Sequence, residues 1–346
     1  MNIGQRQKLI LASIIEQYIH SGEPVGSKTL CEKLPITVSS ATVRNEMSDL
    51  TEKGLLEQRH TSGGRVPSAL AYRYYVDSLM IPVPLNQWEV NRVNKVLAMN
   101  SGDPERLLAD TIRLLAETTE CVSFYTSVAD GVDTVQGVEL IPAGHSKAML
   151  VMLTAGGIIK SSVCNIHGDI DEKFRETFYA VVREELVGTP LTQVTLAKVQ
   201  NLSVTLGGMI FPMINVLTSL CVLCEEASRS EIHVEGETNL LSHEEFGERV
   251  YPLLTFLAGK EKLRDLVHTK MNTGKLTEVL IGEECGQYEL SGSSILLSKY
   301  FYGQRRCGTI GILGSTRIDY QRLMPLFEYI TNLTGRLLSE RGMLYE

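Results

Sequence analysis

The side chains best suited to a chemical task lie between Ser39 and Lys53, a segment with helical periodicity. Its apolar side consists of Val43, Met47 and Leu50, and its opposite side of Ala41, Asn45 and Ser48, flanked by Thr42, Arg44 and Asp49. An Asn side chain can pair with adenine, and an Arg side chain can pair with guanine or a phosphate. The pattern therefore favours DNA recognition. The alternative is a solvated polar face on a helical domain that binds another protein.

The start of this segment and the turn after it could hold DNA phosphates. Ser39 or Ser40 is a good N-cap, and a helix N-terminus with nearby hydroxyl groups suits a phosphate oxygen. The turn has Gly63 and Gly64 at its tip, with Arg59, His60, Thr61 and Arg65 beside them. A compact basic hairpin of this kind can lie along a minor groove or the DNA backbone. An ordinary surface hairpin is the alternative.

Three short helices and a hairpin must position these residues. The first helix carries the apolar stripe Leu11, Ile14, Ile15, Tyr18 and Ile19. Gly22 is its expected stop, and Ser27 is the expected N-cap of a second helix that Pro35 ends. The third helix closes at Gly54, and strands over 55–59 and 65–66 form the hairpin. This order is typical of a winged helix-turn-helix.

Length and composition exclude several classes of protein. The 346 residues are 43% hydrophobic and 21% charged, which excludes a wholly disordered or collagen-like chain. A net charge of −8 argues against a protein that coats nucleic acid through bulk charge, although a local basic surface is compatible with it. Seven scattered cysteines do not resemble a secreted disulfide framework, and no signal-peptide pattern is visible. A reducing cytoplasm is the expected location.

One uncharged stretch, 199–224, is long enough to cross a bilayer at roughly 20 residues. Gly207, Gly208, Pro212 and Asn215 interrupt it, and no Trp or Lys/Arg cluster flanks it. We therefore expect no membrane contact, but a buried helix broken near Pro212 or a subunit interface. A dimer contact and an intramolecular core helix are the two alternatives for this stretch.

The C-terminal two thirds of the chain mix strands and helices. Strands are predicted over 135–141, 148–153, 158–166, 294–300 and 309–313, and helices over 174–186, 246–256, 261–270 and from Tyr320 onward. The mixture indicates the α+β class.

No catalytic, metal or cofactor site can be assembled from the spacing of reactive residues. Cys221 and Cys224 lack a second cysteine pair and a nearby His, so buried thiols are favoured over a metal or redox site. Gly308, Gly311 and Gly314 do not match the dinucleotide-binding pattern, and no P-loop sequence occurs. The chain is therefore not expected to be an enzyme.

Longer motifs run through the chain in a distinctive order. They are GEPVGSKTL at 22–30, VSSATVRNEM at 38–47, GLL at 54–56, HTSGGRVP at 60–67, YRYYVD at 72–77, GETNLL at 236–241 and GSTRIDY at 314–320. Together they closely resemble the HrcA family of heat-inducible transcription repressors. The N-terminal motifs are specific, and the C-terminal ones are individually weaker.

This resemblance implies an α+β fold in three parts. They are an N-terminal winged helix-turn-helix over 1–80, a GAF-like α+β domain over 85–165 and 236–346, and an inserted dimerisation region over 166–235. Pro82 and Pro84 agree with the first boundary. The family is further expected to act as a homodimer on double-stranded DNA, at an inverted-repeat (CIRCE) operator of chaperone genes. The chaperonin GroEL is the expected partner that keeps the repressor active until heat diverts it.

The residue patterns and the resemblance together define the candidate DNA contacts. They are Ser27, Lys28, Ser39, Ser40, Thr42, Arg44, Asn45, Ser48, Arg59, His60, Thr61 and Arg65. Gly63 stands where the family pattern has Ala, and Arg59 where it has Pro, so affinity or sequence preference could differ. Because GAF-like folds often bind small molecules, the alternative function is a winged-helix regulator controlled by a ligand. A more distant alternative is a chaperonin client or interaction protein without DNA affinity.

Overall fold

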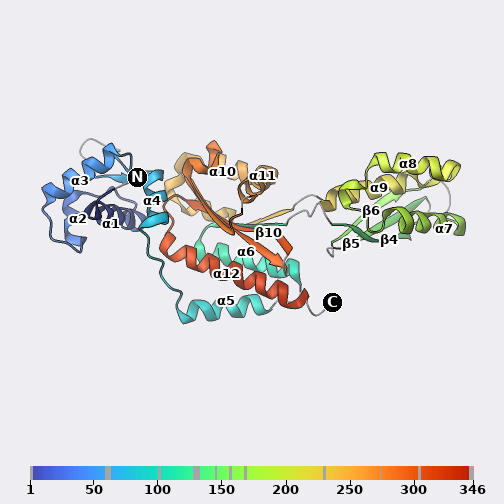
Figure 1. The fold of residues 1–346 in the computed structure, drawn as a ribbon, viewed down its shortest axis with the longest axis horizontal. Coiled ribbons are helices and arrows are strands. Elements are labelled where there is room, and N and C mark those ends of the chain that lie inside the picture. Colours follow the sequence, from blue (N-terminus) through green and yellow to red (C-terminus); the bar gives the residue numbers. More distant parts are fainter. Residues whose placement is uncertain are drawn as a thin grey trace. The chain divides into compact units, whose positions relative to one another are not determined.

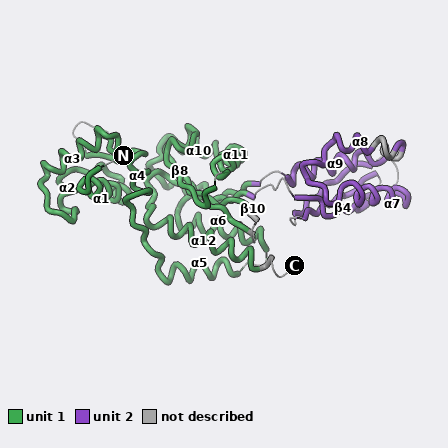
Figure 2. Tube along the Cα trace, viewed as in Figure 1, with its two compact units in different colours: residues 1–126, 232–346 green, residues 127–231 purple. Residues whose placement is uncertain are grey.

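The computed structural model of the chain describes residues 3–58, 64–99, 103–127, 133–144, 146–155, 158–166, 170–228, 231–272, 274–302 and 305–342. Two compact units make up the chain (Figure 2). One joins residues 1–126 to residues 232–346, and the other consists of residues 127–231. The second unit is therefore an insertion in the sequence of the first.

The N-terminal part of the first unit is a winged helix-turn-helix, as predicted (Figure 1). Its elements are α1 (Gln5–Ser21), α2 (Ser27–Lys33), α3 (Ser40–Glu52), β1 (Leu56–Glu57) and β2 (Val66–Pro67). Gly22 ends α1 in the left-handed region at φ 70°, and its N–H donates to the Tyr18 carbonyl at 2.9 Å. The predicted stripe is confirmed for Leu11, Ile14 and Ile15, which are fully buried.

Two details of the helix starts and of the wing differ from the prediction. Gly26, and not Ser27, occupies the N-cap position of α2, so Ser27 is the first residue of the helix. The strand predicted over 55–59 is shorter, because β1 covers only Leu56–Glu57. Arg59, His60 and Thr61 lie outside the described residues.

A fourth helix, α4 (Ala69–Ser78), follows the wing directly and was not predicted. Ser68 caps it, because its Oγ accepts a hydrogen bond from the Ala71 N–H at 3.2 Å. Tyr72 and Tyr75 of α4 are buried in an apolar cluster that also contains residues of α1 and of the C-terminal helix. The winged helix and the central sheet therefore share one core.

A five-stranded sheet forms the centre of the first unit. Its strand order is β7 (Ile232–Glu235), β3 (Val122–Ser127), β10 (Arg305–Ser315), β9 (Ser293–Tyr302) and β8 (Thr277–Ile281). β9 and β10 pair antiparallel, with Gly311 opposite Leu297. The two strands predicted over 294–300 and 309–313 are confirmed.

Helices cover both faces of this sheet (Figure 1). One face packs on α6 (Pro104–Thr119) and α12 (Tyr320–Gly342), with α5 (Gln87–Met99) outside them, and the other on α10 (Val250–Ala258) and α11 (Lys260–Met271). Alternate residues of β9 point to opposite faces, so Leu296 joins the first cluster and Ile295 and Leu297 join the second. This mixed helix and sheet architecture confirms the α+β class.

Three glycines of β10 explain why the sheet packs closely at its centre. A Cβ on Gly311 would lie 2.6 Å from Cε2 of Phe124, and a Cβ on Gly314 would lie 2.7 Å from Sγ of Cys121. A Cβ on Gly308 would overlap the Thr126 carbonyl oxygen. The glycine spacing noted in the sequence is therefore a packing feature of the sheet.

Gly311→Ala is expected to destabilise the protein by about 1–3 kcal/mol, because the new methyl group has no space beside the buried Phe124 ring. Chemical unfolding of the variant and the wild type measures this difference. Gly274→Ala is the matched control, since nothing lies within 4 Å of a Cβ at that position. Equal stability of the Gly311 variant and the wild type would contradict the tight packing.

The second unit is a three-stranded antiparallel sheet with helices on one face. Its strands are β4 (Val135–Pro142), β5 (Lys147–Thr154) and β6 (Ile159–Asn165), in the order β4-β5-β6, and its α-helices are α7 (Glu172–Val181), α8 (Leu196–Leu206) and α9 (Ile210–Ser228). The three strands and the helix predicted over 174–186 are confirmed, with α7 continuing into a π-helical turn, Val182–Leu186.

The unit boundary differs from the predicted one at residue 166. The three strands belong with the helices that follow them, and not with the central sheet. The physical reason is burial: Val138, Leu150 and Met152 of the sheet share an apolar core with Leu217 and Leu220 of α9. A strand-rich and a helix-rich stretch of sequence thus form one folding unit.

The uncharged stretch 199–224 contributes to the intramolecular core of the second unit, whereas Phe211, Ile214 and Val222 of α9 are exposed. α8 and α9 meet at the turn Gly207–Met209, close to the break predicted near Pro212. Met213, Val216 and Leu217 of α9 are buried within the second unit. Among the described residues, no helix is long and apolar enough to span a membrane.

Candidate nucleic-acid interface

The third helix has the two faces that its sequence predicts. Val43, Met47 and Leu50 are buried, whereas Ala41, Arg44, Asn45 and Ser48 are exposed. Ser39 caps the helix: its Oγ accepts from the Thr42 N–H at 3.1 Å and lies 2.9 Å from the Thr42 hydroxyl. The cap fixes the start of a helix whose outward side carries Arg44 and Asn45, the two side chains suited to base edges.

The starts of α2 and α3 are joined by their serine hydroxyl groups. Ser27 Oγ and Ser40 Oγ lie 3.1 Å apart. Lys28, the next residue of α2, is exposed. Two helix N-termini, a lysine and hydroxyl groups therefore meet at one polar surface, which is a suitable environment for a phosphate.

The wing is attached to the body of the domain through Arg65. Its backbone exchanges two hydrogen bonds of 2.9 Å with Val25, and its Nε donates to Thr51 Oγ1 at 3.2 Å. Gly64 lies against the chain at Pro24, where a Cβ would come within 2.7 Å of the carbonyl carbon. The sequence assigned Arg65 only a DNA contact, and the structure adds a role in holding the wing to the last turn of α3.

Glu46 is a buried residue of α3 that the sequence analysis did not single out. Its carboxylate accepts from Arg6 Nε at 2.6 Å and from Gln7 Nε2 at 2.8 Å, both on α1. Lys53 Nζ donates to Gln7 Oε1 at 2.9 Å and extends the network. Burial raises the pKa of Glu46, but the bonds from Arg6 and Gln7 outweigh it and hold the pKa below its ordinary 4.5. The network pins the exposed helix to α1.

Glu46→Ala is expected to destabilise the protein by about 1–3 kcal/mol at pH 7, because it leaves the buried Gln7 amide of α1 without its acceptor. Since the folded pKa is depressed, this stabilisation is complete above the unfolded value of 4.5 and is lost as the pH falls through the folded value. Urea unfolding at pH 7 and at several pH values below 4.5 measures the change.

Glu52→Ala, an exposed substitution on the same helix, is the control for the Glu46 experiment. It should unfold like the wild type at each pH. A stability gap between wild type and Glu46→Ala that does not shrink in acid would show that the carboxylate charge is not what holds α3.

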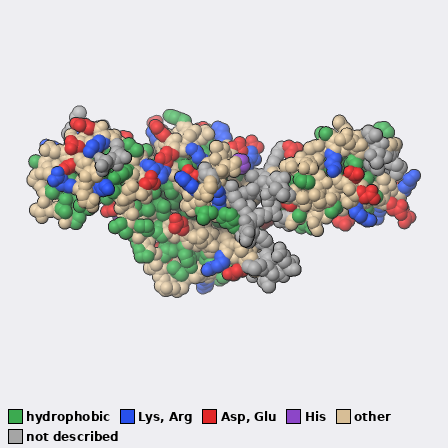
Figure 3. All heavy atoms as spheres, in the orientation of Figure 1, with side chains coloured by type: hydrophobic (Ala, Val, Ile, Leu, Met, Phe, Trp, Pro, Cys, Tyr) green, Lys and Arg blue, Asp and Glu red, His purple; other side chains and the backbone are tan. Residues whose placement is uncertain are grey.

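Acidic and basic side chains lie interspersed over the winged helix on the face that Figure 3 presents. Residues 1–77 carry nine Lys and Arg against eight Asp and Glu. Bulk attraction of DNA is therefore weak, and affinity must come from individual contacts such as those of α3.

The cysteine pair on α9 has the surroundings of structural thiols. Cys221 and Cys224 are both buried, and the Cys224 thiol lies 3.4 Å from the Met152 sulfur. Burial raises the pKa of Cys224 to about 12, so the reactive thiolate is disfavoured. The part of the chain that the structure describes contains no group of three acidic, His or Cys side chains able to hold a metal ion.

Two family models cover most of the chain. The model described as "Winged helix-turn-helix transcription repressor, HrcA DNA-binding" matches residues 2–78, and the model described as "HrcA protein C terminal domain" matches residues 105–324. The chain belongs to the HrcA family. The resemblance inferred from the motifs is thereby confirmed, and the family is one of transcription repressors, which is not an enzyme class.

Relatives in the HrcA family align over nearly the whole chain. Proteins named "Heat-inducible transcription repressor HrcA" from Ruminiclostridium cellulolyticum and Acetivibrio thermocellus are 31% and 30% identical, over 96% and 95% of both chains. The protein of the same name from Lactobacillus gasseri is 31% identical over 98% of both chains. A solved structure described as a hypothetical protein aligns with a TM-score of 0.62 and 25% identity, over 98% of this chain and 99% of the other.

Proposed function

We propose that this protein is a heat-inducible repressor of chaperone operons that binds an inverted-repeat (CIRCE) operator as a homodimer. The observation that carries the proposal is the capped helix α3, whose exposed side presents Arg44 and Asn45. The heat response is taken from relatives that share about a third of its residues over nearly its full length.

The candidate residues fall into groups with different roles in this proposal. Arg44 and Asn45 read base edges in the major groove, and Ser48 lies beside them. Ser27, Lys28, Ser39, Ser40 and Thr42 hold phosphates at the joined starts of α2 and α3. The wing residues Arg59, His60, Thr61 and Arg65 contact the backbone or the minor groove.

Dimerisation follows from the small size of the reading surface. One winged helix offers few base contacts, whereas two copies related by a two-fold axis read two half-sites of an inverted repeat. Binding of the second half-site is then intramolecular, which raises the apparent affinity without any new contact.

The open face of the sheet in the second unit supports a dimer contact. Cross-strand pairing aligns Ile141, Met149 and Val163 in one row and Leu153 and Ile159 in another, on the face opposite the helices. Ile159 and Val163 are 66% and 62% exposed. We infer that a second copy covers this face, because its two exposed apolar rows, on either side of the row Glu139, Val151 and Ser161, give one patch that can pair with its own copy about a two-fold axis. This contact is proposed in place of one on the stretch 199–224, which supplies Met213, Val216 and Leu217 to the core.

Regulation by the chaperonin GroEL is the remaining part of the proposal. Apolar side chains gather over α5 and the start of α12 (Figure 3), and Ile81, Val83 and Trp88 beside them are exposed. Contiguous apolar surface on a folded protein is typical of a partner site. We infer that the chaperonin binds the apolar surface over α5 and the start of α12, and that this binding keeps the repressor active.

A gel shift tests the function directly. The protein is titrated onto an inverted-repeat fragment from a chaperone promoter, onto a scrambled fragment of equal length, and onto each with GroEL present. Preference for the inverted repeat and a chaperonin-dependent gain in binding are expected. Equal binding to both fragments would refute sequence-specific repression, and no effect of GroEL would refute the proposed regulation.

A further inference from the structure

We propose that Arg73 is a positioning residue for operator recognition, which fixes the orientation of the winged helix on the central sheet. The inference rests on the proposed function, since it concerns how the winged helices of two protomers are oriented for binding one operator. It goes beyond that function because Arg73 lies on α4, away from the residues expected at the DNA.

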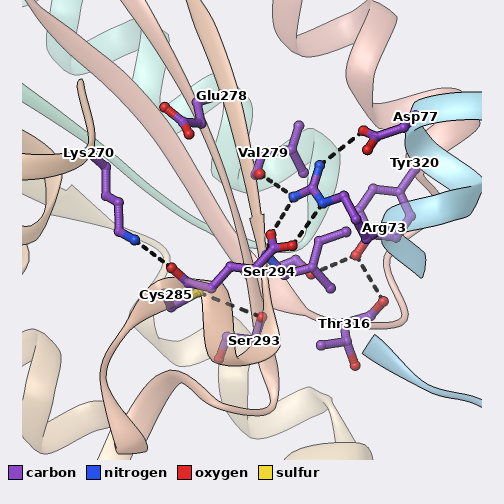
Figure 4. Close-up of polar contacts among 12 residues, drawn as sticks. Arg73, Asp77, Lys270, Glu278, Val279, Cys285, Ser293, Ser294, Thr316 and Tyr320 are labelled. Carbon is purple, nitrogen blue, oxygen red and sulfur yellow. Dashed lines mark hydrogen bonds and ion pairs between the residues drawn. The ribbon is translucent and has the colours of Figure 1, made fainter. Parts of the chain in front are cut away.

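The guanidinium group of Arg73 is bound from three sides (Figure 4). Its Nε donates to Glu284 Oε1 at 2.9 Å and a terminal nitrogen donates to Oε2, so the pair is bidentate. The same terminal nitrogen also donates to the Val279 carbonyl of β8, and the other donates to Asp77 Oδ1 at 3.2 Å. Val279 and Glu284 lie on β8 and on the turn after it, more than 200 residues further along the chain, whereas Asp77 lies one turn further along α4.

Glu284 is itself held in place, so that the pair has a rigid base. Glu284 lies in the 3-10 helix Gly282–Cys285, which directly follows β8. Its carboxylate accepts a hydrogen bond from the Ile281 N–H at 2.9 Å. Lys270 Nζ donates to its carbonyl oxygen at 2.7 Å. Burial raises the pKa of Glu284, but the hydrogen bonds from Arg73 and the Ile281 N–H, together with the charges of Arg73 and Lys270, outweigh it and keep the pKa low, so the ion pair is formed at neutral pH.

Aromatic packing seats the same helix on the sheet. The Tyr72 ring lies 5.9 Å from the Tyr320 ring, and the Tyr320 hydroxyl lies 2.6 Å from Ser294 Oγ and donates to the Thr316 carbonyl at 3.0 Å. These contacts pack α4 on Tyr320 at the start of α12, and Tyr320 is held in turn to Ser294 of β9 (Figure 4). They provide attraction between the two parts, but ring contacts restrain a rotation less strictly than a bidentate fork does.

Because the ion pair is partly exposed, its effect on the orientation of α4 can be distinguished from its effect on the free energy of unfolding. The side chains of Arg73 and Glu284 are 25% and 40% exposed, so water screens the pair and its contribution to folding is smaller than that of a buried pair. A planar fork with three acceptors outside α4, the two Glu284 carboxylate oxygens and the Val279 carbonyl, nevertheless admits one orientation of α4. Losing it should leave the fold intact and allow the winged helix to pivot.

A pivoting winged helix affects the two kinds of DNA site differently. A single half-site needs only one α3, whose contacts do not involve Arg73. A full inverted repeat needs two helices at a fixed spacing, and a looser joint lowers the effective concentration of the second. The signature of a positioning residue is therefore a loss confined to the full operator.

The test compares Arg73→Ala and Arg73→Lys with the wild type on a full inverted repeat and on a single half-site. We expect about a tenfold weaker full-operator affinity for Arg73→Ala and no change at the half-site. Arg73→Lys keeps the charge without the fork and should lose nearly as much. Arg106→Ala is the control, because its exposed ion pair with Asp103 lies within one helix start.

Hydrogen exchange over α4 provides a readout that does not depend on DNA. Exchange should be faster in Arg73→Ala than in the wild type, while the melting temperature is unchanged. Equal exchange in both proteins, equal losses at half-site and full operator, or tighter binding by the variant would each overturn the inference. If the wild type shows no preference for the inverted repeat, but α4 still exchanges faster in Arg73→Ala than in the wild type, the proposed function is refuted. The role of Arg73 in orienting the winged helix then still holds.

Discussion

Alanine in place of Arg44 or Asn45 is expected to weaken operator binding by about 1–3 kcal/mol for each half-site contact that is lost. Both side chains are exposed on α3, and their opposite neighbours Val43 and Met47 are buried, so the helix should keep its place in either variant. Because a homodimer loses the contact twice, the effect on a full inverted repeat should be close to twice that on a half-site.

Salt titration of the same gel shifts separates base reading from phosphate contact. Loss of a base contact weakens operator binding and leaves a scrambled fragment unaffected. Loss of a phosphate contact weakens both and lowers the slope of log affinity against log salt by about one. We expect the first pattern for Asn45→Ala, whose amide has no charge to lose.

An adjacent Asn and Arg on another helix provide matched controls. Asn91 and Arg92 are exposed on α5, so Asn91→Ala and Arg92→Ala remove the same chemical groups elsewhere in the first unit. They should bind the operator like the wild type. Unchanged operator affinity in both α3 variants would show that α3 is not the reading helix.

The elements of the winged helix could be predicted because their signals are local. The apolar stripe of α1, the stop at Gly22 and the apolar side of α3 each depend on residues within a few positions of one another. α6 was missed although it begins with Asp103 as N-cap and Pro104 in its first turn, which is a readable helix start.

Other features have no local signal. Glu46 stands next to buried Met47, and an acidic residue on the apolar side of a helix indicates a buried partner, but nothing nearby identifies Arg6. The pairing of Arg73 with Glu284 depends on the tertiary fold, as does the grouping of β4 to β6 with α9. These features depend on contacts between segments that are far apart in the sequence. The periodicity of apolar residues within one segment does not predict such contacts.

The second large effect is expected from a charge on the open sheet face of the second unit. Val163→Lys places an ammonium group in the row formed by Ile141, Met149 and Val163. If a second copy covers this face, two such groups must lose water near a two-fold axis and repel each other. The protomer itself should fold normally, because Val163 is already largely exposed.

Sedimentation equilibrium should show a dimer for the wild type and a monomer for Val163→Lys. Operator affinity should fall by about 10²–10⁴-fold, because the second half-site no longer benefits from a linked partner. Half-site affinity should stay the same, which distinguishes this variant from those in α3. Equal circular dichroism would confirm that the fold is kept and that only assembly has changed.

Leu196→Lys controls for the addition of a charge to the second unit. Leu196 is also an exposed apolar residue, but it lies at the start of α8 and not on the sheet. Its variant should remain dimeric and bind the operator normally. A monomeric Leu196→Lys together with a dimeric Val163→Lys would place the contact on the helices. A monomeric wild type with full operator affinity would refute the dimer altogether, because the two-fold symmetry of the operator would then have no counterpart in the protein.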